Sequence, residues 1–279
     1  MNLVNFNQFQ VRKKTYGGAN GNKLSICIGD SLYMLKLPSH ATKNKNLSYT
    51  NSCISEYLGS HIFNMIGIKA QETILGEYEY NGVKRISVAC KDFEEDGYVL
   101  KDFASVKNQI IDSKSNGYGT DINEILETIE QQSLIDPVFL SNTFWEMFVI
   151  DALLGNWDRH NGNWGFLYNQ GTDDIKIAPI FDCGSCLFPQ IDDDIIDTIM
   201  KDKSQLNARI FNFPTSALLY NGKRINYYDF IQNHEFKECD NAIIRIKNKI
   251  NFDDIPCISV KHKNFLKLII KKRFDAYFN

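Results

Sequence analysis

Three oxygen-bearing side chains in the second half of the chain have the types and spacing needed to handle a phosphoryl group. Asp158 and Asn163 lie five residues apart in LLGNWDRHNGNWGFL, whose glycines predict a loop. A kinase catalytic loop uses this spacing to offer a carboxylate base to a hydroxyl group and an amide oxygen to Mg²⁺. Asp182 follows the apolar run IKIAPIF and precedes a glycine turn, where its carboxylate can supply a second oxygen ligand. The set indicates phosphoryl transfer from ATP, with Asp158 as base and Asn163 and Asp182 as metal ligands.

The first part of the chain carries residues that can hold the phosphates. Lys36 lies inside the apolar run LYMLKLP, where an inward ammonium group needs an anionic partner such as a phosphate. Glu56, on the next predicted helix, is the carboxylate expected to pair with Lys36 and so to position it for the reaction. Upstream, YGGANGNK is a small-residue loop whose backbone N–H groups can cover phosphates. Its candidate cofactor-binding residues are Gly17, Gly18, Ala19, Asn20, Gly21, Asn22 and Lys23.

Each of these features also has an ordinary structural interpretation. Asp158 and Asn163 could cap helices or form Asx turns, as such residues commonly do in loops. YGGANGNK could be a simple turn, and Lys36 and Glu56 could both be solvated. The catalytic interpretation therefore depends on the combination of features and on none of them singly.

Three further patterns are interpreted as structural. Cys183 and Cys186 form one CxxC pair, whereas a structural zinc site normally has four ligands. The acidic run Asp192, Asp193 and Asp194 precedes a predicted helix, where negative charge favours the helix dipole. His160 has no Ser or Cys nucleophile motif nearby, so we expect it to order the loop.

Local sequence patterns predict two lobes. Two pairs of short β-prone runs, each joined by a Gly-containing turn, surround a periodic helical segment at 50–66. After about residue 100 the pattern becomes helical, with one β-rich interruption at roughly 164–181. We expect an α+β, two-lobed protein-kinase-like fold. A β-rich N-terminal lobe at 1–95 would carry the phosphate loop and an antiparallel sheet, and a mainly helical C-terminal lobe at 96–279 would carry the catalytic loop and the metal-binding segment.

Composition excludes some classes of function. The 279 residues carry a net charge of −3, which argues against a chain that coats nucleic acid or an anionic membrane. We find neither a classical signal peptide nor an uncharged apolar run of about 18 residues, and seven dispersed cysteines suit reduced thiols. These features predict a cytoplasmic protein. They leave open whether it acts in its own cytoplasm or after delivery to another cell.

The same motifs resemble a known family. LLGNWDRHNGNWGFL followed by IAPIFDCGS resembles the catalytic core of the HipA-like serine/threonine kinases, and YMLKLP and SEY (55–57) resemble its lysine strand and following helix. The resemblance implies ATP, Mg²⁺ and transfer to Ser or Thr of a protein substrate, including the chain itself. Carried over by motif, Asp158 is the base, Asn163 and Asp182 bind metal, and Lys36 contacts phosphate.

The chain departs from this family in two respects. HipA toxins carry an extra N-terminal subdomain, whereas this sequence starts almost at the phosphate loop, which argues against docking to a DNA-binding antitoxin. Gly17 precedes Gly18, Ala19 and Asn20 where the family has a regulatory serine before Gly-Ala-Gln, which argues against loop autophosphorylation as a switch. Two alternatives stay open: a nucleotide-binding signalling module without turnover, and a small-molecule phosphotransferase.

Overall fold

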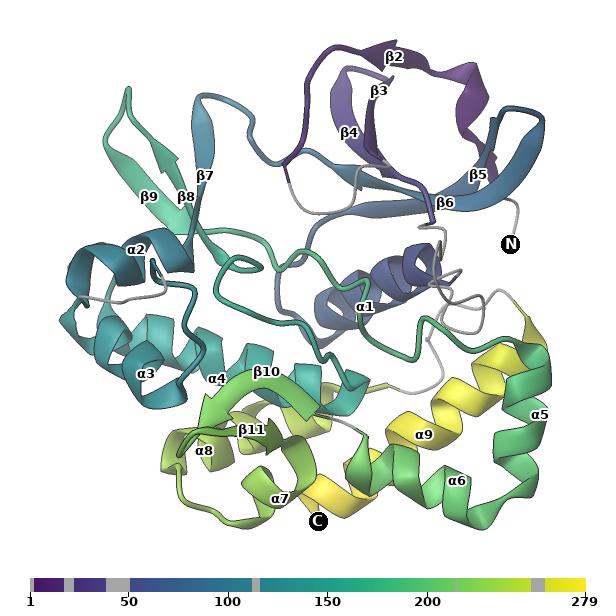
Figure 1. The fold of residues 1–279 in the computed structure, drawn as a ribbon. Helices are drawn as coiled ribbons and strands as arrows, with labels where there is room; N and C mark the ends of the chain where they lie inside the picture. Colours follow the sequence, from purple (N-terminus) through teal and green to yellow (C-terminus); the bar gives the residue numbers. More distant parts are fainter. Residues whose placement is uncertain (1–2, 18–22, 39–50, 112–115, 214, 252–258) are drawn as a thin grey trace.

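The chain forms a β-rich lobe above a larger, mainly helical lobe (Figure 1). The structure is a computed structural model that describes residues 3–17, 23–38, 51–111, 116–213, 215–251 and 259–279. The expected mixed, two-lobed kinase-like fold is confirmed. Between Lys91 and Tyr98 the chain leaves the upper sheet and enters a sheet of the lower lobe. The lobe boundary at 95 and 96 stays a prediction.

A six-stranded sheet forms most of the upper lobe. Its strands are β1 (Val4–Asn5), β2 (Gln10–Arg12), β3 (Lys23–Ile28), β4 (Ser31–Lys36), β5 (Thr73–Tyr80) and β6 (Val83–Lys91), in the order β1-β5-β6-β4-β3-β2. Both predicted hairpins are present. Asn81 and Gly82 form the second turn with φ values of 52° and 74°, the left-handed conformation that tight hairpin turns require. The sheet therefore places Lys36 at the end of β4, facing the lower lobe.

Helix α1 (Ser52–Ile66) lies beneath this sheet and packs against β5 and β6 (Figure 1). It occupies the segment predicted at 50–66 and ends at Gly67, whose φ of 89° closes the helix. The buried face includes Leu58, Ile62 and Phe63, together with Glu56. A carboxylate on this mostly apolar face needs a buried partner, which for Glu56 has to come from outside the helix.

A second sheet joins β7 (Tyr98–Asp102), β8 (Gly165–Asn169) and β9 (Asp174–Ile177). It contains the β-rich interruption expected near 164–181, but the strand predicted from IKIAPIF ends at Ile177. Beyond it, Ile180 donates to the carbonyl of Lys69 and accepts from Gln71, both at 2.8–2.9 Å. This pairing takes the chain out of the sheet towards α1 and delivers the next residues to the space between the lobes.

Helices make up most of the lower lobe. They are α2 (Phe103–Ile110), α3 (Ile122–Gln131), α4 (Pro137–Leu154), α5 (Asp193–Lys201), α6 (Lys203–Asn207), α7 (Tyr227–Gln232), α8 (Lys237–Ile246) and α9 (Val260–Phe278).

Helix α4 is long and apolar enough to cross a membrane, but 61% of it is buried inside the lobe, as expected for a core helix. The described part of the chain also has a hairpin of β10 (Thr215–Tyr220) and β11 (Lys223–Asn226), where the sequence analysis expected only loop and helix.

Candidate active site

Lys36 and its partners connect the two lobes. Its ammonium group lies 2.8 Å from Oε2 of Glu56 and 2.9 Å from Oδ1 of Asp182. The other Glu56 oxygen accepts a hydrogen bond of 3.0 Å from the backbone N–H of Cys183. The pairing of Lys36 with Glu56 is therefore as the sequence analysis expected, and Asp182 joins the same network.

Charge shifts the pKa values of Lys36 and Asp182. Attraction to Lys36 lowers the pKa of Asp182 to about 2, although burial acts in the opposite direction. Burial alone would lower the pKa of Lys36, but the charges of Asp182 and Glu56 raise it well above its ordinary value. Asp182 has a φ of 57°, a left-handed backbone conformation of the kind that clusters at functional sites. Its carboxylate remains 46% exposed, so it can reach a ligand.

The catalytic loop begins where Gly155 ends helix α4 with a φ of 64°. The side-chain nitrogen of Asn163 donates to the backbone oxygen of Asp158 at 2.9 Å. This bond uses the amide nitrogen inside the loop, so the amide oxygen is the atom left for a cation. His160 accepts a hydrogen bond of 3.0 Å from the N–H of Gly162 through Nδ1, in agreement with its expected role in ordering the loop.

Asp158 is a partly buried carboxylate beside these groups. Burial raises its pKa above the ordinary value, and the charge of Asp182 raises it further. His160, Arg159 and Arg224 act in the opposite direction. The charge of Asp182 is among those that act on Asp158, so the expected base lies within electrostatic range of an expected metal ligand.

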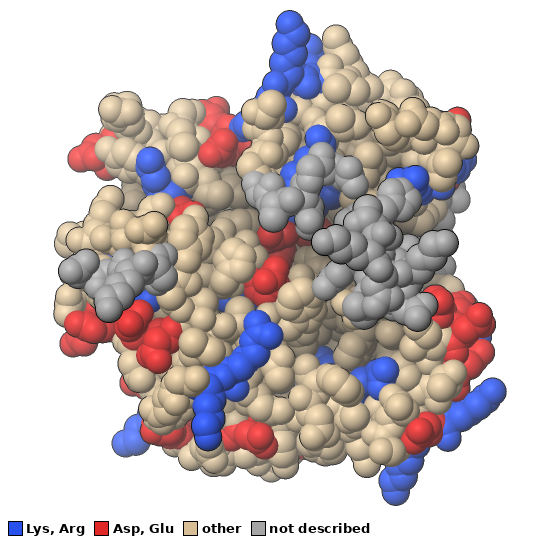
Figure 2. All heavy atoms as spheres, in the orientation of Figure 1, with Lys and Arg blue, Asp and Glu red and all other residues tan. Residues whose placement is uncertain are grey.

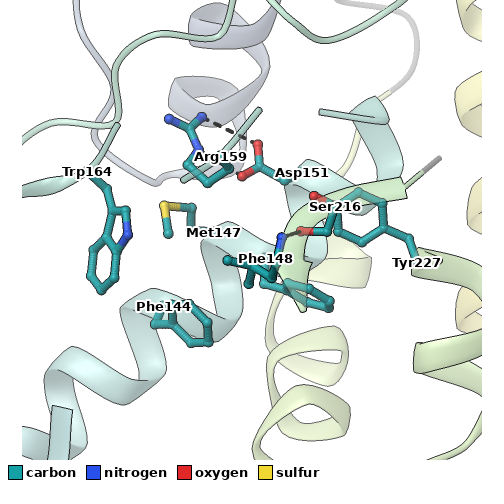
Figure 3. Close-up of a pocket in the computed structure, with 9 residues that line it drawn as sticks. Phe144, Met147, Phe148, Asp151, Arg159, Trp164, Ser216 and Tyr227 are labelled. Carbon is teal, nitrogen blue, oxygen red and sulfur yellow. Dashed lines mark hydrogen bonds and ion pairs between the residues drawn. The ribbon is translucent and has the colours of Figure 1, made fainter. Parts of the chain in front are cut away.

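Arg159 holds the catalytic loop and the Asp182 segment together. Its Nε donates to Oδ2 of Asp151 at 2.8 Å, and Figure 3 shows this ion pair between α4 and the loop. Its Nη1 donates to the backbone oxygen of Asn163 at 2.8 Å and also to that of Phe181. Arg159 is only 3% exposed. One buried guanidinium group therefore bonds to the metal-ligand candidate Asn163 and to the residue that precedes Asp182.

The space behind the loop is tightly filled. Figure 3 shows a cavity between Phe144, Met147 and Trp164 on one side and Tyr227 on the other. Its volume of about 10 Å³ has room for about one water molecule. The Tyr227 hydroxyl donates to the backbone oxygen of Asn156 at 2.7 Å. The loop is thus supported from behind by close packing.

Part of the expected phosphate loop lies outside the described residues, namely Gly18, Ala19, Asn20, Gly21 and Asn22. Its two described ends approach each other, because Nζ of Lys23 donates to the carbonyl of Gly17 at 2.6 Å. Lys23 is also the cross-strand neighbour of Lys36. Burial and the charge of Lys36 lower the pKa of Lys23, which is the environment expected beside an anion site.

The CxxC pair is part of the packing. Cys183 and Cys186 are fully buried, and a Cβ atom added to Gly59 of α1 would lie 2.6 Å from Cβ of Cys183 and 2.9 Å from Sγ of Cys186. Burial raises the pKa of the Cys183 thiol to about 12. Both side chains thus pack the Asp182 segment against α1.

Sequence reasoning missed Asp151 and Arg159 as site residues. A signal was present, because Asp151 stands in the apolar helix PVFLSNTFWEMFVIDALL and a buried carboxylate needs a cationic partner. Arg159 directly follows the expected base in the sequence, but its anchoring role was not predicted.

Comparisons with known proteins agree with this geometry. Residues 15–250 match the family model for the HipA-like C-terminal domain. A serine/threonine-protein kinase, CtkA of Helicobacter pylori, is 48% identical over 269 residues, which covers 94% of this chain and 82% of the relative. The chain belongs to the HipA-like C-terminal domain family, as its motifs predicted.

Two solved structures are similar to the fold. The crystal structure of CtkA, described as a proinflammatory kinase of Helicobacter pylori, matches with a TM-score of 0.91 and 44% identity, covering 99% of this chain and 95% of that chain. HipA of Shewanella oneidensis MR-1, solved with HipB and operator DNA, matches with a TM-score of 0.52 and 10% identity. That match covers 95% of this chain and 65% of HipA, and it supports the fold alone.

The buried Asp151–Arg159 pair can be tested by stability. Asp151→Ala leaves a buried guanidinium group without its carboxylate, so the free energy of unfolding should fall by about 3–5 kcal/mol. Asp197→Ala is the control, because Asp197 forms an exposed pair with Lys261 and exposed pairs contribute little. Urea denaturation of both variants measures the difference. Equal, small losses would contradict the role assigned to Arg159.

Proposed function

We propose that this chain transfers the γ-phosphoryl group of ATP, with Mg²⁺, to protein hydroxyl groups at the site of Lys36, Asp158, Asn163 and Asp182. The enzyme class is shown by family membership and by the close relative: the chain is a serine/threonine protein kinase. The observation that carries the assignment of residues is the contact of Lys36 with both Glu56 and Asp182, beside the Asp158 loop.

The candidate metal ligands suit Mg²⁺. Asn163 offers an amide oxygen and Asp182 a carboxylate oxygen, and hard divalent cations prefer oxygen ligands. When bound, Mg²⁺ would neutralise charge on the nucleotide phosphates. Lys36 would contribute its positive charge to the same phosphates, while Glu56 keeps the ammonium group in position.

Asp158 would accept the proton of the acceptor hydroxyl. Its pKa is raised chiefly by burial, which makes the carboxylate a stronger base for that proton. The bond from Asn163 to the Asp158 backbone and the anchoring by Arg159 restrict the loop, so the carboxylate need not be ordered during the reaction.

Two further features belong to the proposal. The chain itself is an acceptor, as the family resemblance implies. It acts in the cytoplasm, an assignment supported by six free cysteines among the described residues.

Replacement of the base tests the mechanism. Asp158→Asn should lower the rate of labelling of a generic protein acceptor by radiolabelled ATP by about 10²–10⁴-fold, because the amide cannot accept the proton. Asp173→Asn, in the exposed turn between β8 and β9, is the matched control and should leave the rate unchanged. Mass spectrometry should find phosphoserine or phosphothreonine in the acceptor and in the kinase.

Other results would favour the alternatives. ATP binding without any transfer would indicate a signalling module, and transfer only to a sugar or lipid hydroxyl would indicate a small-molecule phosphotransferase. Equal labelling by wild type and Asp158→Asn would overturn the assignment of the base.

The pH dependence of kcat/KM gives a separate test. Asp158 must be deprotonated to act, so the rate should fall as the pH drops through its pKa. Because burial raises that pKa, the fall should be centred above the ordinary aspartate value of 3.8. Circular dichroism at each pH establishes that the protein remains folded. A rate that stays constant down to that ordinary value would contradict the burial effect.

A further inference from the structure

The β10–β11 hairpin is joined to the catalytic loop through one connecting segment. The backbone N–H of Leu219, in β10, donates to the carbonyl of Thr120 at 2.8 Å. The buried side chain of Asn161, in the catalytic loop, donates to the carbonyls of Gly119 and Gly117 at 2.8 and 2.9 Å. These bonds fix the position of the hairpin relative to Asp158.

The hairpin presents two exposed cations, Lys223 and Arg224, on β11. Arg224 is the cross-strand partner of Leu219, the residue bonded to the connecting segment. Figure 2 shows basic side chains over this hairpin, next to acidic side chains in the hollow between the lobes. Within the described residues, neither cation has an ion-pair partner.

Arg224 is close enough to Asp158 for its charge to lower the pKa of that carboxylate. The other basic side chains that act on Asp158 are already engaged. Arg159 is buried and bonded to Asp151, and Nδ1 of His160 accepts from Gly162. Lys36 belongs to the upper lobe and pairs with acidic groups there. Among the described residues whose charge acts on Asp158, Arg224 is therefore the exposed cation that is available to a ligand.

Arg224 is positioned to contact the acceptor segment and not the nucleotide. Lys36 and the phosphate-loop candidates come from the upper lobe, whereas the hairpin belongs to the lower lobe (Figure 1). An acceptor segment with its hydroxyl at Asp158 can extend over the hairpin. An extended chain advances about 3.3 Å per residue, so a side chain two or three residues from the hydroxyl lies about 7–10 Å away.

We propose that β11 selects the acceptor, with Arg224 binding a carboxylate two or three residues from the Ser or Thr that is phosphorylated, and Lys223 adding charge. The guanidinium group can form two parallel hydrogen bonds to one carboxylate, which gives direction as well as attraction. The chain as a whole has a net charge of −3, so recognition of an acidic segment requires a local cation of this kind. This inference rests on the proposed function and names its substrate class.

The test uses the full-length protein and three synthetic peptides with a central Ser in an Ala/Gly background. They carry Asp, Asn or Lys two and three residues on each side of the Ser. Wild type should phosphorylate the Asp peptide with a kcat/KM about tenfold above that of the Asn peptide, as expected for one charge-assisted pair. Arg224→Gln should abolish this preference, and Arg224→Glu should shift it to the Lys peptide. Arg85→Gln, on β6 of the upper sheet, is the control and should keep the wild-type preference.

Several outcomes would overturn the inference. One is that wild type phosphorylates the three peptides with equal kcat/KM, and another is that Arg224→Gln keeps the preference for the Asp peptide. A third is that Arg224→Gln lowers kcat/KM equally for all three peptides, which would place Arg224 on the transferred phosphoryl group. Labelling of a protein acceptor but of no peptide would also overturn it, because recognition would then lie outside the flanking residues. Absence of Asp158-dependent transfer to every acceptor, protein or peptide, would instead contradict the proposed function.

Discussion

The site depends on the fixed position of three consecutive residues between the lobes. Arg159 holds the carbonyl of Phe181 from below, Lys36 holds the carboxylate of Asp182 from above, and Glu56 accepts from the N–H of Cys183. Each anchor is a charged group that is itself paired, which reduces the cost of placing it away from water. The segment that carries a metal-ligand candidate is therefore attached to both lobes.

This arrangement couples the two halves of the reaction site. Lys36 and Glu56 come from β4 and α1 of the upper lobe, where phosphates are expected to bind. Arg159 extends from the catalytic loop and is secured by Asp151 at the end of α4. A change at either anchor would alter the position of the phosphate side relative to the base, and transfer depends on that relative position.

The sequence predicted those parts whose signals are local. The spacing of Asp158 and Asn163, the turn at Asn81 and Gly82, and a lysine in an apolar strand each have a short-range cause. The pairing of Lys36 with Glu56 also followed, because strand and helix are consecutive along the chain. The family resemblance then added the acceptor class, which residue chemistry alone leaves open.

Contacts between residues that are far apart in the sequence explain the features that local patterns did not predict. The run IKIAPIF has strand composition throughout, but its last residues pair with 69–71, more than a hundred positions away. Asn221 and Gly222 carry the same turn signal as Asn81 and Gly82, yet the short β10–β11 hairpin was not expected within a helical lobe. That the charge of Arg224 acts on Asp158 depends on how this hairpin docks, which no local pattern encodes.

Calorimetry of a non-hydrolysable ATP analogue, with and without Mg²⁺, tests whether Asp182 is a metal ligand in a nucleotide site. Mg²⁺ should tighten binding to the wild-type chain, and Asp182→Asn should remove most of this gain, because the variant loses a charged oxygen ligand. Binding to Asp182→Asn that responds to Mg²⁺ as strongly as the wild type would contradict the assignment of Asp182 as a metal ligand and the site built around it.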